Sequence, residues 1–154
     1  MDDLPFAEES LDAIWSEGAI YNIGFEQGLK QWRRFLKPGG VISVSEITWL
    51  RPDPAEEIKR YWQNNYPQID TAANKLAILE RQGYSPVAYF VLPPDCWLEN
   101  YYRPLEAQLP QFLDRHSHSE TALAIAREHE DEQQLYEKYQ SEYSYGFYIA
   151  RRID

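Results

Sequence analysis

The stretch LPFAEESLDAIWSEGAIYNIG, residues 4–24, decides the fold. Its middle, residues 11–16 (LDAIWS), is short, largely apolar and bounded by polar residues, which is typical of a strand buried on both faces of a sheet. Ser16, Glu17 and Gly18 then put polar and small groups at the end of this strand. Ligands in open α/β sheets bind at the carboxyl ends of buried strands. The stretch therefore predicts one wall of a ligand-binding crevice.

A helix and a second strand are expected next. The helix is predicted over residues 24–36 (GFEQGLKQWRRFL), because four large apolar residues recur there at helical spacing: Phe25, Leu29, Trp32 and Leu36. The KPGG sequence at residues 37–40 is expected to end the helix, since Lys37 suits its negative end and the glycines permit positive φ. Residues 41–50 (VISVSEITWL) are rich in β-branched residues and predict a strand that ends in polar and aromatic side chains.

Two further helices are predicted after this strand. Asp53 is expected to cap the first, with Pro54 at its first position and Glu56 at the capping-box spacing. The second is expected over residues 71–82 and to end at Gly83. Both helices connect strands, as crossovers in an α/β fold do.

The last part of the chain alternates in the same way. Residues 85–93 (SPVAYFVLP) predict a strand, and residues 95–143 are expected to be mostly helical, with breaks near Pro104 and at residues 116–119. Residues 144–151 (SYGFYIAR) predict a closing strand, which can lie antiparallel because a long helical excursion precedes it. Strands separated by helical crossovers predict an α/β fold with a parallel sheet.

Composition narrows the class of protein. The 154 residues are 44% hydrophobic, enough for a single domain over residues 1–154 with its own core. The net charge of −10 without a basic cluster argues against a nucleic-acid partner. The single cysteine, Cys96, allows no intrachain disulfide, and neither a signal peptide nor an apolar run of membrane-spanning length is present. We therefore expect a cytoplasmic protein without a membrane partner.

Three short motifs carry a resemblance to a known family: Leu4-Pro5-Phe6, Leu11-Asp12, and Leu36 to Gly40. Together they resemble the second half of a class I S-adenosylmethionine-dependent methyltransferase, in which a D-x-L-P-F loop precedes the fourth strand and L-K-P-G-G follows the next helix. Residues 14–29 (IWSEGAIYNIGFEQGL) resemble a bacterial subgroup of small-molecule methyltransferases. The resemblance implies part of a Rossmann-like sheet, with parallel strands, helices on both faces and a final antiparallel strand.

The same resemblance implies a function and a cofactor. S-adenosylmethionine is the expected cofactor and a small molecule the expected methyl acceptor. The glycine-rich loop that holds the cofactor in this family has no counterpart, because the seven glycines form no G-x-G and no strand is predicted before Leu11. We expect this chain to act as part of a longer or assembled enzyme and to be inactive in isolation.

Five residues are implied as cofactor-binding. Met1 and Asp2 match the loop that borders the adenine in the family, and Ser16, Glu17 and Gly18 match the segment beside its methionine end. The alternative for Met1 and Asp2 is a frayed terminus. The alternative for Glu17 is a helix cap or a solvated side chain, although a carboxylate at the end of a buried strand is costly without a partner.

The expected acceptor pocket draws on residues from three segments: Tyr21, Glu46, Trp49, Trp97 and Tyr101. Glu46 ends the VISVSE strand and is a candidate orienting acceptor, while the aromatic rings are candidates to enclose the acceptor or a cationic amine. Core packing is the alternative for the rings, and Asn22 beside Tyr21 is an equally good helix N-cap. No catalytic residue is assigned, because alignment supplies much of the rate of methyl transfer.

A metal site is not expected at the His-x-His sequence of residues 116–118. No cysteine ligand lies beside it, and Ser119 is a good helix N-cap. Cys96 lacks a neighbouring histidine and is expected to be an inert thiol.

A rival hypothesis follows from the first strand. Without a neighbour on its outer side, the strand over residues 11–16 leaves an unpaired, apolar sheet edge, and such edges pair with other chains. The rival is a non-catalytic truncated module that forms a homodimer through this edge. A third alternative is another Rossmann-like domain in which LKPGG is coincidental.

Overall fold

The computed structural model describes residues 4–154 and divides into two compact units. The first comprises the chain up to Leu92 together with Glu142–Asp154, and the second is Pro93–Ser141. Each unit is described by itself. The single domain predicted over residues 1–154 stays a prediction.

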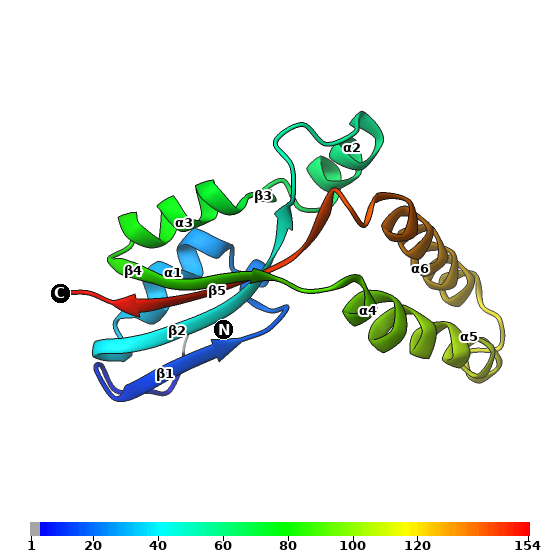
Figure 1. Ribbon diagram of the computed structural model, residues 1–154. Coiled ribbons are helices and arrows are strands. Elements are labelled where there is room, and N and C mark those ends of the chain that lie inside the picture. Colours follow the sequence, from blue (N-terminus) through cyan, green and yellow to red (C-terminus); the bar gives the residue numbers. More distant parts are fainter. Residues whose placement is uncertain (1–3) are drawn as a thin grey trace. The chain divides into compact units, whose positions relative to one another are not determined.

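The first unit is built on a five-stranded sheet (Figure 1). Its strands are β1 (Leu11–Ser16), β2 (Leu36–Trp49), β3 (Asp70–Thr71), β4 (Tyr84–Val91) and β5 (Tyr143–Arg152). The order is β1-β2-β5-β4, with the short β3 paired to the end of β2. β1 is parallel to β2, and β5 is antiparallel to both β2 and β4. The predicted Rossmann-like class and the final antiparallel strand are confirmed.

Eight helical segments within residues 4–154 join these strands. The first unit contains the 3-10 turn η1 (Ile20–Asn22), α1 (Phe25–Arg33), α2 (Glu56–Asn65) and α3 (Ala72–Arg81). The second contains α4 (Pro94–Trp97), the π-helical turn η2 (Leu98–Tyr102), α5 (Arg103–Arg115) and α6 (Glu120–Tyr139), so residues 94–102 are helical turns that lead into α5. With η1 and η2 counted as turns, six α-helices remain, and they follow the predicted order with the strands apart from the short β3, which the sequence does not predict.

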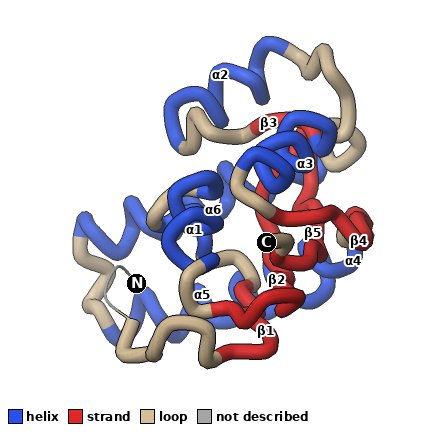
Figure 2. Tube along the Cα trace, turned by 90° about the vertical axis from the view of Figure 1, so that its left-hand side faces the viewer, coloured by secondary structure: helices blue, strands red, loops and turns tan. Residues whose placement is uncertain are grey.

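The core of the first unit lies between one face of the sheet and helices α1 and α3 (Figures 1 and 2). The predicted stripe of α1 is buried there, with Phe25, Leu29 and Trp32 at most 4% exposed. These side chains pack with Ile42 of β2 and Tyr148 of β5. Each such side chain stabilises the fold by about 1.5–3 kcal/mol relative to an exposed one.

The end of α1 differs from the prediction. The helix stops at Arg33, and Leu36 already begins β2, so residues 37–40 belong to the strand. Pro38 explains the difference, because a proline disfavours helical backbone in the residue before it. Lys37 does not interact with the helix end; its Nζ forms an ion pair with Asp12 Oδ1 at 2.8 Å.

The prediction that β1 is buried on both faces is wrong for the described residues. Trp15 is 70% exposed, and Asp12 and Ala13 are exposed as well. Trp15 lies on the sheet face opposite α1, where its ring is 5.6 Å from that of Phe147, which stacks on Phe90 at 5.0 Å. We name these three side chains the aromatic face. A short apolar run does not distinguish a strand covered on both faces from one covered on a single face.

Two predicted helix starts give opposite results. Asp53 does not cap α2, whose N-cap is Ala55; the Ala55 N–H donates to Glu142 Oε2 at 2.6 Å, and Asp53 pairs with Arg51. The Glu142 carboxylate, just before β5, therefore binds the N–H of the N-cap residue, and no side chain caps α2 itself. The α3 prediction is confirmed within one residue, and Gly83 follows that helix with a φ of +79°.

The second unit is helical, as predicted. Pro104 does not break it, because it lies in the first turn of α5, where a helix does not need its N–H. The break at residues 116–119 is confirmed, with Ser119 Oγ accepting from the N–H of Ala122. No helix within residues 4–154 is long and apolar enough to cross a membrane.

Candidate functional site

The candidate cofactor residues lie where the parallel strands β1 and β2 end. The chain leaves β1 at Ser16 and turns at Gly18, which has a φ of +51°. The Gly18 N–H donates to Ser45 Oγ of β2 at 2.8 Å. This hydrogen bond fixes the start of the segment from Glu17 to Gly24, which we name the rim loop.

Glu17 lies in solvent at this edge. Its Oε1 accepts a hydrogen bond from Trp15 Nε1 at 2.5 Å. The expectation of a costly carboxylate at a buried strand end is wrong, because the side chain is exposed and β1 is covered on one face only. Ser16 differs: its Oγ is buried and has no hydrogen-bond partner within residues 4–154. The edge therefore offers the exposed carboxylate of Glu17 and the buried hydroxyl of Ser16, which has no partner within residues 4–154.

The middle of the rim loop is η1, which carries Tyr21 and Asn22. Tyr21 is 45% exposed, and its ring meets that of Tyr66 edge-to-face at 6.1 Å. Asn22 is not the N-cap of α1, because its Nδ2 donates to the Ala19 carbonyl and Gly24 occupies the cap position. Tyr21 thus stays accessible to a ligand, while Asn22 braces its own turn.

Glu46 is buried on the opposite side of β2 from Ser45. Its side chain is 0% exposed, and its Oε1 lies 3.3 Å from Nζ of Lys75, which is 1% exposed. Burial raises the pKa of the Glu46 carboxyl and lowers the pKa of the Lys75 amine, and the attraction between the two opposes both shifts. Burial and this ion pair separate Glu46 from solvent, although its Oε2 has no hydrogen-bond partner within residues 4–154.

The other candidate aromatics have packing partners. The Trp49 ring, at the end of β2, meets Tyr143 edge-to-face at 6.3 Å. Trp97 and Tyr101 belong to the second unit, where Trp97 stacks on Tyr136 at 4.8 Å and is buried, while Tyr101 is 46% exposed. Trp97 therefore packs in the core of the second unit. Met1 and Asp2 lie outside the described residues.

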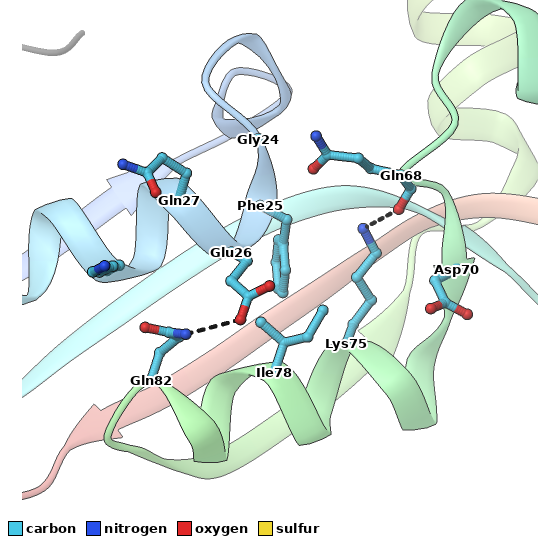
Figure 3. A pocket seen from close by; sticks show the side chains of 10 residues that line it. Gly24, Phe25, Glu26, Gln27, Gln68, Asp70, Lys75, Ile78 and Gln82 are labelled. Carbon is cyan, nitrogen blue, oxygen red and sulfur yellow. Dashed lines mark hydrogen bonds between the residues drawn. The ribbon is translucent and has the colours of Figure 1, made fainter.

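A groove of ≈ 530 Å³ opens between the start of α1, the segment before β3, and α3 (Figure 3). Phe25 and Lys75 line it beside polar side chains such as Gln68 and Asp70. Figure 3 shows Lys75 reaching from α3 to the Gln68 carbonyl, which accepts its hydrogen bond at 2.8 Å.

Sequence reasoning missed Lys75. The available signal was a lysine in the apolar stripe of α3, four residues before Leu79, matched by a glutamate in an otherwise apolar strand. Each is expensive to bury alone, so the two together indicate a pair.

Metal coordination finds no support in the described part of the chain, where no three His, Cys, Asp or Glu side chains converge. His118 Nε2 instead lies 3.0 Å from Asp114 Oδ1 on the same helical turn. Cys96 is a free thiol.

Residues 1–44 match the family model of the methyltransferase domain. The fold superposes with a TM-score of 0.77 on the S-adenosylhomocysteine complex of a SAM-dependent methyltransferase from Geobacter sulfurreducens, at 21% identity over 96% of this chain. The chain carries part of a class I S-adenosylmethionine-dependent methyltransferase fold. The LPF, LD and LKPGG motifs all lie within the residues that match this family model, although LKPGG lies in the strand rather than at the helix end.

Two further solved structures superpose on this chain. A SAM-dependent methyltransferase from Thiobacillus denitrificans superposes with a TM-score of 0.76 at 19% identity, over 96% of this chain and 60% of its own. The [4+2]-cyclase SpnF superposes with a TM-score of 0.70 at 21% identity, over 98% of this chain and 53% of its own.

A curated relative matches just under half of the chain with a higher sequence identity. The demethylmenaquinone methyltransferase of Corynebacterium glutamicum (strain R) is 37% identical over 73 residues. The match covers 46% of this chain and 32% of the relative, so the chain corresponds to about a third of that enzyme.

Proposed function

We propose that this chain contributes one wall of the cofactor crevice of a cytoplasmic methyltransferase, which transfers a methyl group from S-adenosylmethionine to an unidentified small molecule. The proposal treats the chain as part of a longer or assembled enzyme. The observation that carries it is the β1–β2 edge, where Ser16, Glu17 and Gly18 end a strand of a methyltransferase fold. SpnF has the same fold and is named for a different reaction, so fold alone does not set the chemistry.

The residues at this edge fit a cofactor with an amino-acid end. The Glu17 carboxylate is exposed and can accept hydrogen bonds from an ammonium group. The buried Ser16 Oγ lacks a partner within residues 4–154, which a polar ligand atom would provide. S-adenosylmethionine, when bound, supplies the methyl group as an electrophile on a sulfonium. Met1 and Asp2 remain proposed contacts of the adenine.

The acceptor is proposed to lie against aromatic side chains. Tyr21 on the rim loop presents a half-exposed ring and hydroxyl, and Trp49 ends the neighbouring strand. Trp97 and Tyr101 belong to the second unit and stay predictions from the sequence. Glu46 is left out of this pocket, because its burial and its ion pair with Lys75 give it a different role.

Glu17→Gln tests the cofactor site. The substitution keeps the size of the side chain but removes the charge that favours an ammonium group, so we expect about tenfold weaker binding of S-adenosylhomocysteine by titration calorimetry. Glu80→Gln, an exposed change on α3, is the matched control and should leave binding unchanged. Equal affinity of wild type and Glu17→Gln would remove Glu17 from the site. No heat at millimolar ligand would contradict cofactor binding by this chain and favour the alternative below.

The alternative is a non-catalytic module that self-associates. The observation that favours it is the outer edge of β1, which pairs with no strand within residues 4–154, together with the exposed ring of Trp15 beside it. Unpaired edges with exposed apolar side chains recruit other strands. On this alternative, two copies pair through β1 to form a homodimer.

Sedimentation velocity tests the alternative. Wild-type chain should sediment as a dimer at micromolar concentration, and the double variant Ala13→Lys/Trp15→Lys should sediment as a monomer, because charge on an edge strand opposes pairing. Val87→Lys places the same charge at an exposed position of the far strand β4 and should stay dimeric. A wild-type monomer at every concentration would contradict self-association.

A further inference from the structure

The buried ammonium of Lys75 makes four contacts with three separate parts of the first unit. It lies 3.3 Å from Glu46 Oε1 on β2 and donates to the Gln68 carbonyl at 2.8 Å. It also faces two aromatic rings, that of Phe25 at 4.7 Å and that of Tyr66 at 5.7 Å. An ammonium with this many partners in a buried position holds their separation, because moving any of them exposes an unpaired charge.

Two of these contacts lie in residues 66–69, which we name the tether segment. It connects α2 to β3 and contributes a carbonyl and a ring to Lys75. Neither the Tyr66 hydroxyl nor Glu46 Oε2 makes a well-formed hydrogen bond within residues 4–154, yet burial and the nearby carboxylate raise the pKa of Tyr66. The Lys75 contacts therefore link the segment to β2 and α1, in addition to the buried side chain of Ile69.

The tether segment also holds the rim loop at two points. The Tyr66 ring meets Tyr21 edge-to-face at 6.1 Å. At the end of the loop, the Gln68 amide lies so close to Gly24 that an added Cβ would be 3.0 Å from Gln68 Oε1. Gly24 has a φ of +86°, which also favours glycine. The loop is therefore confined on the side that faces α3.

We infer that Lys75 is a positioning residue, which holds the rim loop at the carboxyl end of β1 by fixing the tether segment to Glu46. The inference rests on the proposed function for its purpose, since the rim loop carries Glu17, Gly18 and Tyr21. It does not place Lys75 in contact with cofactor or acceptor. The path runs from Glu46 through Lys75 to Tyr66 and Gln68, and from these to Tyr21 and Gly24.

Hydrogen exchange of the ligand-free chain tests the inference. The double variant Glu46→Leu/Lys75→Met removes both charges together and leaves the Gln68 carbonyl without its donor. Rim-loop amides such as Gly18 and Ile23 should exchange about tenfold faster than in wild type, while amides of β2 and β5 change less than about twofold. Equal acceleration throughout the sheet, or an unchanged rim loop, would overturn the inference.

A second variant and a control complete the experiment. Tyr66→Leu keeps the ion pair but removes the ring that meets Tyr21, and it should also accelerate exchange at Ile23. Lys59→Met removes a half-exposed lysine on α2 and should leave the rim loop as in wild type. Because no ligand is present, this result is independent of the calorimetric titration: exchange can support the positioning role while the absence of heat contradicts cofactor binding, or the reverse.

Discussion

Replacing Lys75 with methionine should lower the free energy of unfolding by about 3–5 kcal/mol, because it leaves the Glu46 carboxylate buried without its cation. The side chain of Glu46 is 0% exposed and that of Lys75 is 1% exposed, so water cannot replace the lost partner. Urea denaturation at neutral pH measures the change. Lys59→Met, which removes a half-exposed lysine paired with Glu56, should cost less than about 0.5 kcal/mol.

The double variant Glu46→Leu/Lys75→Met distinguishes the cost of leaving one buried charge unpaired from the cost of removing both charges together. Its free energy of unfolding should be less than about 2 kcal/mol below that of wild type, because no unpaired charge remains and only the hydrogen bond to the Gln68 carbonyl is lost. A double variant as unstable as Lys75→Met would show that the cost comes from lost packing. A single variant with wild-type stability would show that Glu46 finds another partner or is neutral in the folded protein.

The pH dependence of the Lys75→Met variant gives a further check on the same prediction. Burial already raises the pKa of Glu46 above its ordinary value of 4.5, and removing Lys75 raises it further. A carboxyl whose pKa is higher in the folded than in the unfolded state keeps its proton longer when the protein is folded. Its cost to the free energy of unfolding is therefore absent below about pH 4.5 and grows as the pH rises toward and through the folded pKa. The difference between Lys75→Met and wild type should therefore shrink on acidification.

Gly146→Ala should lower the free energy of unfolding by about 3–5 kcal/mol and the Tm by about 10 °C or more. A Cβ at this position of β5 would lie 2.8 Å from Thr48 Oγ1 and from Tyr89 Cε2, and 2.9 Å from the Tyr148 hydroxyl. The Thr48 and Tyr148 hydroxyls are hydrogen-bonded to each other at 2.7 Å in the buried core. Separating them leaves the buried Tyr148 hydroxyl without its partner, in addition to the steric strain, while Thr48 Oγ1 still donates to the Glu46 carbonyl at 2.8 Å.

Gly39→Ala is the matched control for this substitution. Nothing lies within 4 Å of a Cβ at Gly39, but its φ is +76°, so the expected cost is the backbone strain alone, about 1 kcal/mol. Thermal unfolding followed by circular dichroism compares the two variants. Equal costs would show that the space beside Gly146 adjusts, and that packing around β5 is looser than these distances indicate.

The strands and most helices were predictable because their signals are local. The bounds of β1 follow from one apolar run between polar residues, and α3 is defined by a stripe that ends at Gly83. The two-residue β3 has no such signal, since only its pairing with the end of β2 makes it a strand. The predicted start of α2 was wrong for the same reason: no side chain caps this helix, and Glu142, distant in sequence, binds the N–H of Ala55.

The candidate site was only partly predictable. The polar residues after β1 were found because the end of a strand is visible in the sequence, and the structure places Glu17 in solvent there. Glu46 was also singled out, but the sheet face on which its side chain lies was not predicted. Strand residues alternate between faces, and its partner Lys75 lies 29 positions away in the sequence. Which face is covered, and by what, depends on tertiary packing that a single sequence does not contain.

The second unit leaves and rejoins the sheet at adjacent points of one antiparallel pair. Where β4 ends, the Leu92 N–H donates to the Tyr145 carbonyl, and the Ser144 hydroxyl donates back to the Leu92 carbonyl. A short hairpin turn could therefore bridge the same two ends. The helical unit is therefore an insertion between β4 and β5, whose length and surface can diverge between homologous proteins without changing the register of any strand.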